Sequence, residues 1–162
     1  LISLAVANLL LVLVVVNGAI LHTQQNVSEG DSLFLKLAPR DPRSLILGDY
    51  MVLRYEISRE AGKSGKPESE IPTRGKLILA LDDRGVGSVK EFADVREASE
   101  TERLIRYRRS RRGYQFGLES FFFEEGDAKA FEAAQFAEVK LAPDGEAVLV
   151  GLRDENLTPI EP

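Results

Sequence analysis

Residues 1–21 contain no charged side chain and consist mainly of Leu, Val, Ile and Ala. As a helix, a stretch of this length spans about 30 Å, which matches the hydrocarbon core of a bilayer. The apolar region of a cleavable signal peptide is shorter, about 7–15 residues, and no clean cleavage site with small residues follows it here. We therefore predict a retained single transmembrane anchor over residues 1–21, with a cleaved signal peptide as the alternative.

The residues after this segment indicate its orientation. Residues 22–35 contain no Lys or Arg, whereas Glu29 and Asp31 are present. Because cytoplasmic flanks are rich in Lys and Arg, this flank is predicted to lie on the outer side of the membrane. The predicted organisation is an anchor (1–21), a polar linker (22–31), an extracytoplasmic β-rich domain (32–153) and a loose C-terminal tail (154–162).

Composition excludes several classes of function. The net charge of −5 and the pI near 5.1 argue against a general polyanion binder, and no nucleic-acid partner is predicted. The chain has no Cys, and His22 is its only histidine, so a thiolate site, a His-based zinc site and a Ser-His-Asp triad are excluded within one chain. We predict neither a cofactor nor a metal.

Short apolar runs separated by turn residues predict a mainly β domain. A first strand is expected near residues 33–37, and an exposed loop is expected over residues 59–74. Asp127 is a plausible N-cap for one short helix over residues 128–136. Three hairpins are expected, formed by residues 76–81 with 86–92, 103–110 with 114–118, and 138–141 with 147–152. This pattern predicts a curved antiparallel sheet or a partly closed barrel.

One stretch carries the most specific local pattern. Asp41, Pro42 and Arg43 predict a turn, and Gly48 with Asp49 predicts a second one. The residues that follow alternate, so a strand is expected over residues 50–58 with Met51, Leu53, Tyr55 and Ile57 on its buried face. Asp49 is expected to accept hydrogen bonds within its turn, with a ligand-binding or catalytic role as the alternative.

Two segments resemble the signatures of one known family. The segment Gly48-Asp49-Tyr50-x-x-Leu53-x-Tyr55, preceded by Asp41-Pro42-Arg43, resembles the GDYXXLXY family of bacterial membrane-anchored proteins. The segment Gly117-Leu118-Glu119-Ser120-Phe121-Phe122-x-x-Glu125-Gly126 is similar to a later pattern of that family. Leu47 stands where an Arg is common in the family. The resemblance implies a single-pass protein of the bacterial inner membrane with a periplasmic domain, and it transfers no activity.

The densest run of positive charge lies in the second predicted hairpin. It comprises Arg103, Arg106, Arg108, Arg109, Arg111 and Arg112, interleaved with Tyr107 and Tyr114. Such a run can hold an anion, meet anionic lipid headgroups or face an acidic partner. The simpler interpretation is a solvated hairpin whose charges discourage edge pairing.

Acidic side chains surround three consecutive Phe residues. Glu119, Glu124, Glu125 and Asp127 could serve as a catalytic acid and base or hold a hard cation, but spacing alone brings no two of them together. A structural ion pair of Glu119 with Arg43 or Arg54 is the favoured interpretation. Alternation predicts that Phe121 and Phe123 point inward and that Phe122 points outward.

Three hypotheses for function follow from these features. The first is a non-enzymatic accessory subunit that packs beside a multi-spanning membrane partner and covers its outer face. The second is an extracytoplasmic sensor that holds an anion on the Arg hairpin. The third is a hydrolase similar to signal peptidases, but Arg40 stands at the position of the nucleophile and Ser44 lies too close to the turn. Lys76 and Lys90 are only generic candidates for its base, which requires desolvation.

Overall fold

The computed structural model describes residues 8–18, 30–39, 46–47, 50–93, 98–111 and 113–161. The strands are β1 (Asp31–Lys36), β2 (Ile46–Leu47), β3 (Tyr50–Val52), β4 (Arg74–Leu81), β5 (Val86–Phe92), β6 (Glu102–Ser110), β7 (Gly113–Gln115), β8 (Ser120–Phe122), β9 (Phe136–Leu141) and β10 (Ala147–Arg153). The short helices are α2 (Glu56–Gly62), η1 (Glu68–Glu70) and η2 (Asp127–Ala133). The domain is mainly β, as predicted.

Residues 8–18 form an α-helix whose side chains are exposed. Asn17 is accommodated within it, because its side-chain amide donates to the Leu13 carbonyl 2.8 Å away, one turn earlier. None of the helices in the described ranges has the length and apolar content needed to cross a bilayer. The transmembrane segment over residues 1–21 therefore stays a prediction.

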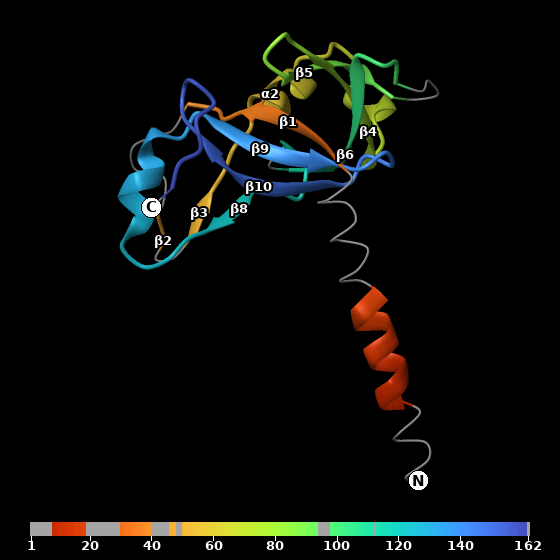
Figure 1. Ribbon diagram of the computed structural model, residues 1–162. Coiled ribbons are helices and arrows are strands. Elements are labelled where there is room, and N and C mark those ends of the chain that lie inside the picture. Colours follow the sequence, from red (N-terminus) through yellow and green to blue (C-terminus); the bar gives the residue numbers. More distant parts are fainter. Residues whose placement is uncertain are drawn as a thin grey trace.

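A curled sheet of seven strands forms the body of the domain, in the order β10-β9-β1-β5-β4-β6-β7 (Figure 1). The three expected hairpins are its antiparallel pairs β4–β5, β6–β7 and β9–β10. The sheet is not antiparallel throughout, because β1 runs parallel to β5. Turn chemistry identifies each hairpin locally, whereas the parallel contact depends on how separate hairpins assemble.

The curl brings the tip of the β9–β10 hairpin to β6. Strand β6 pairs with β7 only from Arg108 onward, so its edge near Arg106 remains available. The Arg106 amide donates to the Gly145 carbonyl at 2.8 Å across this gap. Irregular registers in the β4–β5 and β9–β10 pairs add the local twist that curling requires. The sheet is thus a half-barrel joined at one corner.

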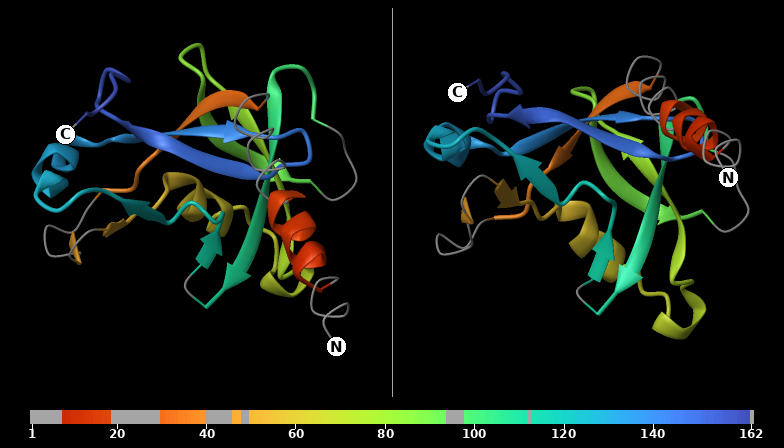
Figure 2. Two further views of the ribbon diagram at one scale, coloured as in Figure 1. Left: turned by 60° about the horizontal axis from the view of Figure 1, so that its bottom comes forward. Right: turned by 90° about the horizontal axis from the view of Figure 1, so that it is seen from below.

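A second, smaller sheet has the order β2-β3-β8. In both views of Figure 2 it lies beside η2, at the end of the curled sheet away from β6 and β7. Phe121 on β8 packs edge-on against Phe131 of η2, with ring centroids 4.9 Å apart. The smaller sheet is therefore fixed to the body through aromatic contacts on its inner face.

The predicted strand over residues 50–58 is wrong in its second half. Strand β3 ends at Val52, and α2 begins at Glu56. The predicted buried face is nevertheless confirmed, since Met51, Leu53, Tyr55 and Ile57 are each at most 2% exposed. Extended residues 51–55 bury alternate side chains, and α2 then buries Ile57 and Ala61 against the core. The side chains of the predicted face are therefore buried over all of residues 51–57, although the strand is replaced by a helix within this range.

The helix content differs from the expected single helix. The predicted exposed loop over residues 59–74 contains the end of α2 and all of η1. The predicted helix over residues 128–136 is the 3-10 helix η2, and its N-cap is Gly126 in a left-handed conformation rather than Asp127.

Residues 154–161, expected as a loose tail, return to β10, where the Ile160 amide donates to the Leu152 carbonyl at 3.1 Å.

Candidate functional site

The two segments that resemble a family signature lie side by side. Strand β3 pairs antiparallel with β8, placing Tyr50 opposite Phe122, Met51 opposite Phe121 and Val52 opposite Ser120. The segments are far apart in sequence, and the pairing makes them neighbours in one sheet. Asp41, Pro42, Arg43, Gly48 and Asp49, the other residues singled out in the first segment, lie outside the described ranges.

Beyond the paired strands, backbone and phenol groups continue the junction. The Leu53 amide donates to the Glu119 carbonyl, and the Tyr55 hydroxyl donates to the Leu118 carbonyl, each at 2.7 Å. Burial raises the pKa of the Tyr55 phenol, and the nearby charge of Glu119 raises it further. Tyr55 therefore remains a neutral hydrogen-bond donor that joins the two segments.

Glu119 holds the turn that precedes β8. Its carboxylate accepts the Phe116 amide at 2.5 Å and the Gly117 amide at 3.1 Å. Gly117 has φ +81°, a conformation that favours glycine and turns the chain at this point. The described contacts of the Glu119 carboxylate are thus backbone amides, in place of the expected ion pair with Arg54. Arg43, the other expected partner, lies outside the described ranges.

The outer face of the smaller sheet carries exposed apolar side chains. Phe122 is 72% exposed and Val52 is 43% exposed, and the ring of Phe122 lies 5.7 Å from that of Tyr50. The predicted orientation of the three Phe residues is confirmed, since Phe121 and Phe123 pack toward Phe131. Glu125 and Gly126 follow in an exposed turn before η2. We call the surface formed by Tyr50, Val52 and Phe122 the motif face.

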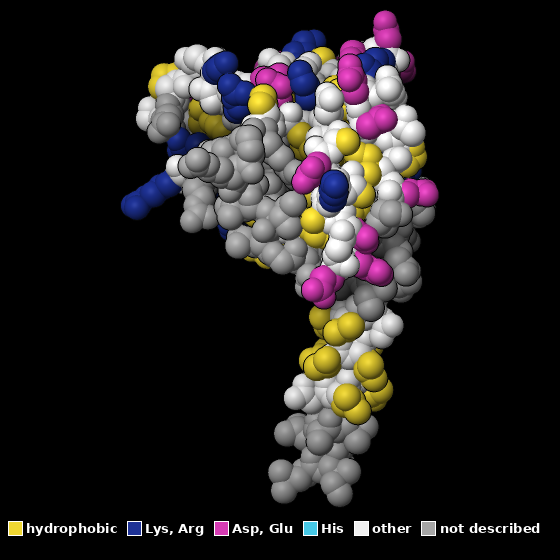
Figure 3. All heavy atoms as spheres, turned by 90° about the vertical axis from the view of Figure 1, so that its left-hand side faces the viewer, with side chains coloured by type: hydrophobic (Ala, Val, Ile, Leu, Met, Phe, Trp, Pro, Cys, Tyr) yellow, Lys and Arg dark blue, Asp and Glu magenta, His cyan; other side chains and the backbone are white. Residues whose placement is uncertain are grey.

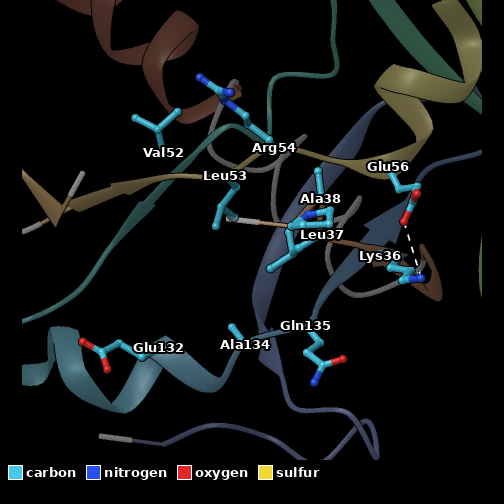
Figure 4. Close-up of a pocket in the computed structure, with 11 residues that line it drawn as sticks. Lys36, Leu37, Ala38, Val52, Leu53, Arg54, Glu56, Glu132, Ala134 and Gln135 are labelled. Atoms are coloured by element: carbon cyan, nitrogen blue, oxygen red, sulfur yellow. Dashed lines mark ion pairs between the residues drawn. The ribbon is translucent and has the colours of Figure 1, made fainter. Parts of the chain in front are cut away.

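A hollow of about 470 Å³ opens beside this junction (Figure 4). Its rim carries the ion pair between Lys36 and Glu56, 3.5 Å apart. Figure 4 shows that Leu53 points toward Leu37, while Arg54 points to the opposite side of the segment. The hollow is lined by apolar, amide and charged side chains.

The predicted Arg run does not form one patch. Arg103 forms an ion pair with Asp31 at 2.7 Å, and Arg106 forms one with Asp144 at 2.5 Å. Arg109 lies opposite Tyr114. As neighbours along the strand, Arg108 and Arg109 lie on opposite faces of the hairpin. Arg111 is exposed at the turn, and Arg112 lies outside the described ranges. Alternation along β6 divides these side chains between the two faces of the sheet.

In the structure, two cationic side chains from another strand lie beside this run, a proximity that the sequence did not indicate. Arg74 of β4 lies directly opposite Arg108, and Lys76 lies directly opposite Arg106. The four side chains border a hollow of about 660 Å³ together with residues 115–117 and 119. No local signal could have found this group, because it depends on the register between β4 and β6.

Comparison with protein families shows that the family described as GDYXXLXY protein matches residues 12–152. This range contains both paired segments, the described hollows and the four cations. Comparison with curated proteins and with solved structures gave no match.

Proposed function

The chain belongs to the GDYXXLXY family, and on that premise we propose a non-enzymatic accessory subunit of the bacterial inner membrane. Residues 1–21 anchor it with a single span, and the β domain lies in the periplasm. The motif face contacts the outer side of a multi-spanning membrane protein. The observation that carries this proposal is the pairing of β3 with β8, which buries one side of both signature segments and exposes aromatic and aliphatic groups on the other.

The N-terminal residues support the anchor. Every residue from Leu9 to Val16 is a large hydrophobic one, and each is between 49% and 70% exposed. A helix that is apolar on all sides is typical of a membrane span or a buried core element. In Figure 3 hydrophobic side chains stand along this helix, whereas Asp and Glu side chains are spread over the domain above it.

The motif face supports the interaction role. Exposed aromatic groups are enriched at the centres of protein interfaces, because a large ring gains much from burial and loses little side-chain entropy. Phe122 is the most exposed large hydrophobic residue of the chain within the described ranges. It extends from a sheet whose inner face is packed, so the platform is formed before a partner arrives.

The polar groups of the two segments support a structural role for them. Tyr55 and Glu119 lie at the junction of the two segments, and both make hydrogen bonds to the backbone of residues 116–118. These contacts fix the position of β8 relative to β3. The described polar groups of the two segments therefore serve the geometry of the motif face.

Replacing Phe122 with serine is expected to reduce recovery of the partner about tenfold or more, which corresponds to about 1.4 kcal/mol of binding free energy. The protein would be tagged at its C-terminus, extracted from native membranes in a mild detergent, and analysed for a stoichiometric multi-spanning protein. The cost to folding should stay within about 1 kcal/mol, because the lost contact is one exposed ring pair with Tyr50.

Val150→Ser is the matched control. Val150 is 48% exposed on β10, outside the motif face, and its replacement should leave partner recovery unchanged. A second variant, in which an unrelated span replaces residues 1–21, should also lose the partner if the anchor contributes contacts. Recovery of the wild-type protein alone and monodisperse would contradict the proposed function, as would equal losses in the Phe122 and Val150 variants.

A further inference from the structure

Two pairs of like charges lie directly opposite each other on one face of β4 and β6. Arg74 faces Arg108, and Lys76 faces Arg106. Directly opposite side chains of antiparallel strands have Cβ atoms about 4.5–5.5 Å apart, and like charges in that position destabilise the pair. Folding thus places four positive charges together in a chain whose net charge is −5. We call these four side chains the cation array.

The cation array is only partly neutralised by its surroundings. Within the described part of the chain, Asp144 is its acidic partner, bound to Arg106 at 2.5 Å. Glu119 also borders the hollow, but its two oxygens accept the amides of Phe116 and Gly117. Among the described groups, the four cations are accompanied by two carboxylates, and this leaves a positive balance that attracts an anion.

Aromatic side chains pack closely on the face of β4 and β6 opposite the cation array. Between its two pairs, Gly75 lies opposite Tyr107 on the other face of the strands. A Cβ at Gly75 would come within 2.8 Å of the Tyr107 hydroxyl, so the ring lies directly against the glycine. Tyr107 also packs edge-on against Phe92 and Tyr114, with ring centroids 5.5 and 5.3 Å apart. Such packing fixes the backbone that carries the cations and reduces the entropy cost of binding.

The spacing defines the ligand. Positions two apart along a strand are separated by about 6.6 Å, and neighbouring strands by about 4.8 Å. The Arg74–Arg108 pair presents arginine forks, which can bind phosphate in a bidentate manner. The second pair presents Lys76 and the donors of Arg106 that Asp144 does not occupy. We propose that the cation array is a binding site for a ligand with two linked phosphate groups, either a soluble diphosphate or a lipid headgroup carrying two phosphates. This site is separate from the motif face and does not depend on the proposed partner.

The test is a titration of the purified full chain in a neutral detergent at fixed ionic strength. Pyrophosphate is expected to bind at least about tenfold more tightly than orthophosphate, because it engages both pairs. The double variant Arg74→Gln/Arg108→Gln should weaken pyrophosphate binding about tenfold or more. Arg111→Gln is the control, because Arg111 is exposed at the β6–β7 turn and does not border the hollow. Equal weakening by the control, or no preference for pyrophosphate, would overturn the proposal.

The same protein in nanodiscs separates the two sources of phosphate. If the natural ligand is a lipid headgroup, cardiolipin in the disc should compete and lower the apparent affinity for pyrophosphate relative to phosphatidylcholine discs. If the ligand is soluble, the two affinities should agree.

Without ligand, Arg74→Gln should raise the melting temperature by about 1–3 °C at low salt, because it relieves repulsion. A fall in melting temperature would show that the array is stabilised by its own surroundings and would overturn its assignment as an anion-binding site.

Discussion

Replacing Tyr55 with alanine is expected to lower the free energy of unfolding by about 3–5 kcal/mol, a large share of what a domain of this size possesses. The ring is 2% exposed and packs edge-on against Phe116, with centroids 6.3 Å apart. Its removal leaves a cavity and also leaves the Leu118 carbonyl without its described donor. Denaturant unfolding followed by circular dichroism measures the loss.

Tyr55→Phe separates packing from hydrogen bonding. It retains the ring and removes the hydroxyl, so a loss of about 1–2 kcal/mol is expected at pH 7. Because the pKa of the phenol is raised in the folded state, the contribution of the hydroxyl to the free energy of unfolding also depends on pH. The unfolded phenol ionises near pH 10, so this contribution is fully present below about pH 10 and is lost as the pH rises further, by up to about 1.4 kcal/mol per pH unit.

The difference in stability between the wild type and Tyr55→Phe should therefore shrink between about pH 10 and pH 11.5. Using the difference cancels the titration of lysines and of other tyrosines that both proteins share. If Tyr55→Phe were as stable as the wild type at pH 7, the Tyr55–Leu118 hydrogen bond would not hold the two signature segments together.

The second large effect is expected at Gly145, where the half-barrel is joined. Gly145 has φ +91°, and a Cβ there would lie 3.2 Å from the Leu104 carbonyl oxygen and 3.3 Å from the Arg106 amide nitrogen. Both are backbone atoms, which cannot move aside as a flexible side chain can. Gly145→Ala should cost about 2–4 kcal/mol, combining backbone strain with separation of the hairpin from β6. Hydrogen exchange of the Arg106 amide should accelerate as well.

Gly65→Ala is the matched control for backbone strain. Gly65 has φ +74°, but nothing lies within 4 Å of its would-be Cβ. Its replacement should therefore cost only about 1–2 kcal/mol. Equal costs at the two positions, with unchanged exchange at Arg106, would mean that contact between the β9–β10 hairpin and β6 adds nothing to stability.

Local turn chemistry made the hairpins predictable from sequence. In the β4–β5 turn the Asp82 carboxylate accepts the amides of Arg84 and Val86. In the β9–β10 turn the Asp144 carboxylate accepts the Glu146 amide, and Gly145 takes its positive φ. These interactions span two to four residues, so a short sequence window contains all the information that they require.

Helix α2 was missed because its own sequence signal is weak. Seven residues are too few for helical periodicity to outweigh the alternation that precedes them. Tertiary contacts decide its structure, since Ile57 and Ala61 are buried and the Glu60 carboxylate accepts the Val89 amide at 2.8 Å. That amide lies at the irregular register between β4 and β5, which no sequence pattern had indicated.

The motif face and the cation array could be predicted from the sequence only in part. Alternation placed Phe122 on the outside, but it could not place Phe122 beside Tyr50. The Arg run was visible, but its division between two faces and its pairing with Arg74 and Lys76 depend on register. Residues distant in sequence are brought together by the assembly of strands, which single-sequence patterns do not encode.

The most direct test of the proposed function is site-specific photo-crosslinking in native membranes. A photoreactive phenylalanine analogue would replace Phe122 in one variant and Val150 in the other, both on exposed strand positions. We expect one dominant crosslink from position 122, to a multi-spanning membrane protein, and none to that protein from position 150. No crosslink from position 122, or the same products from both positions, would contradict the motif face as the surface that binds the partner.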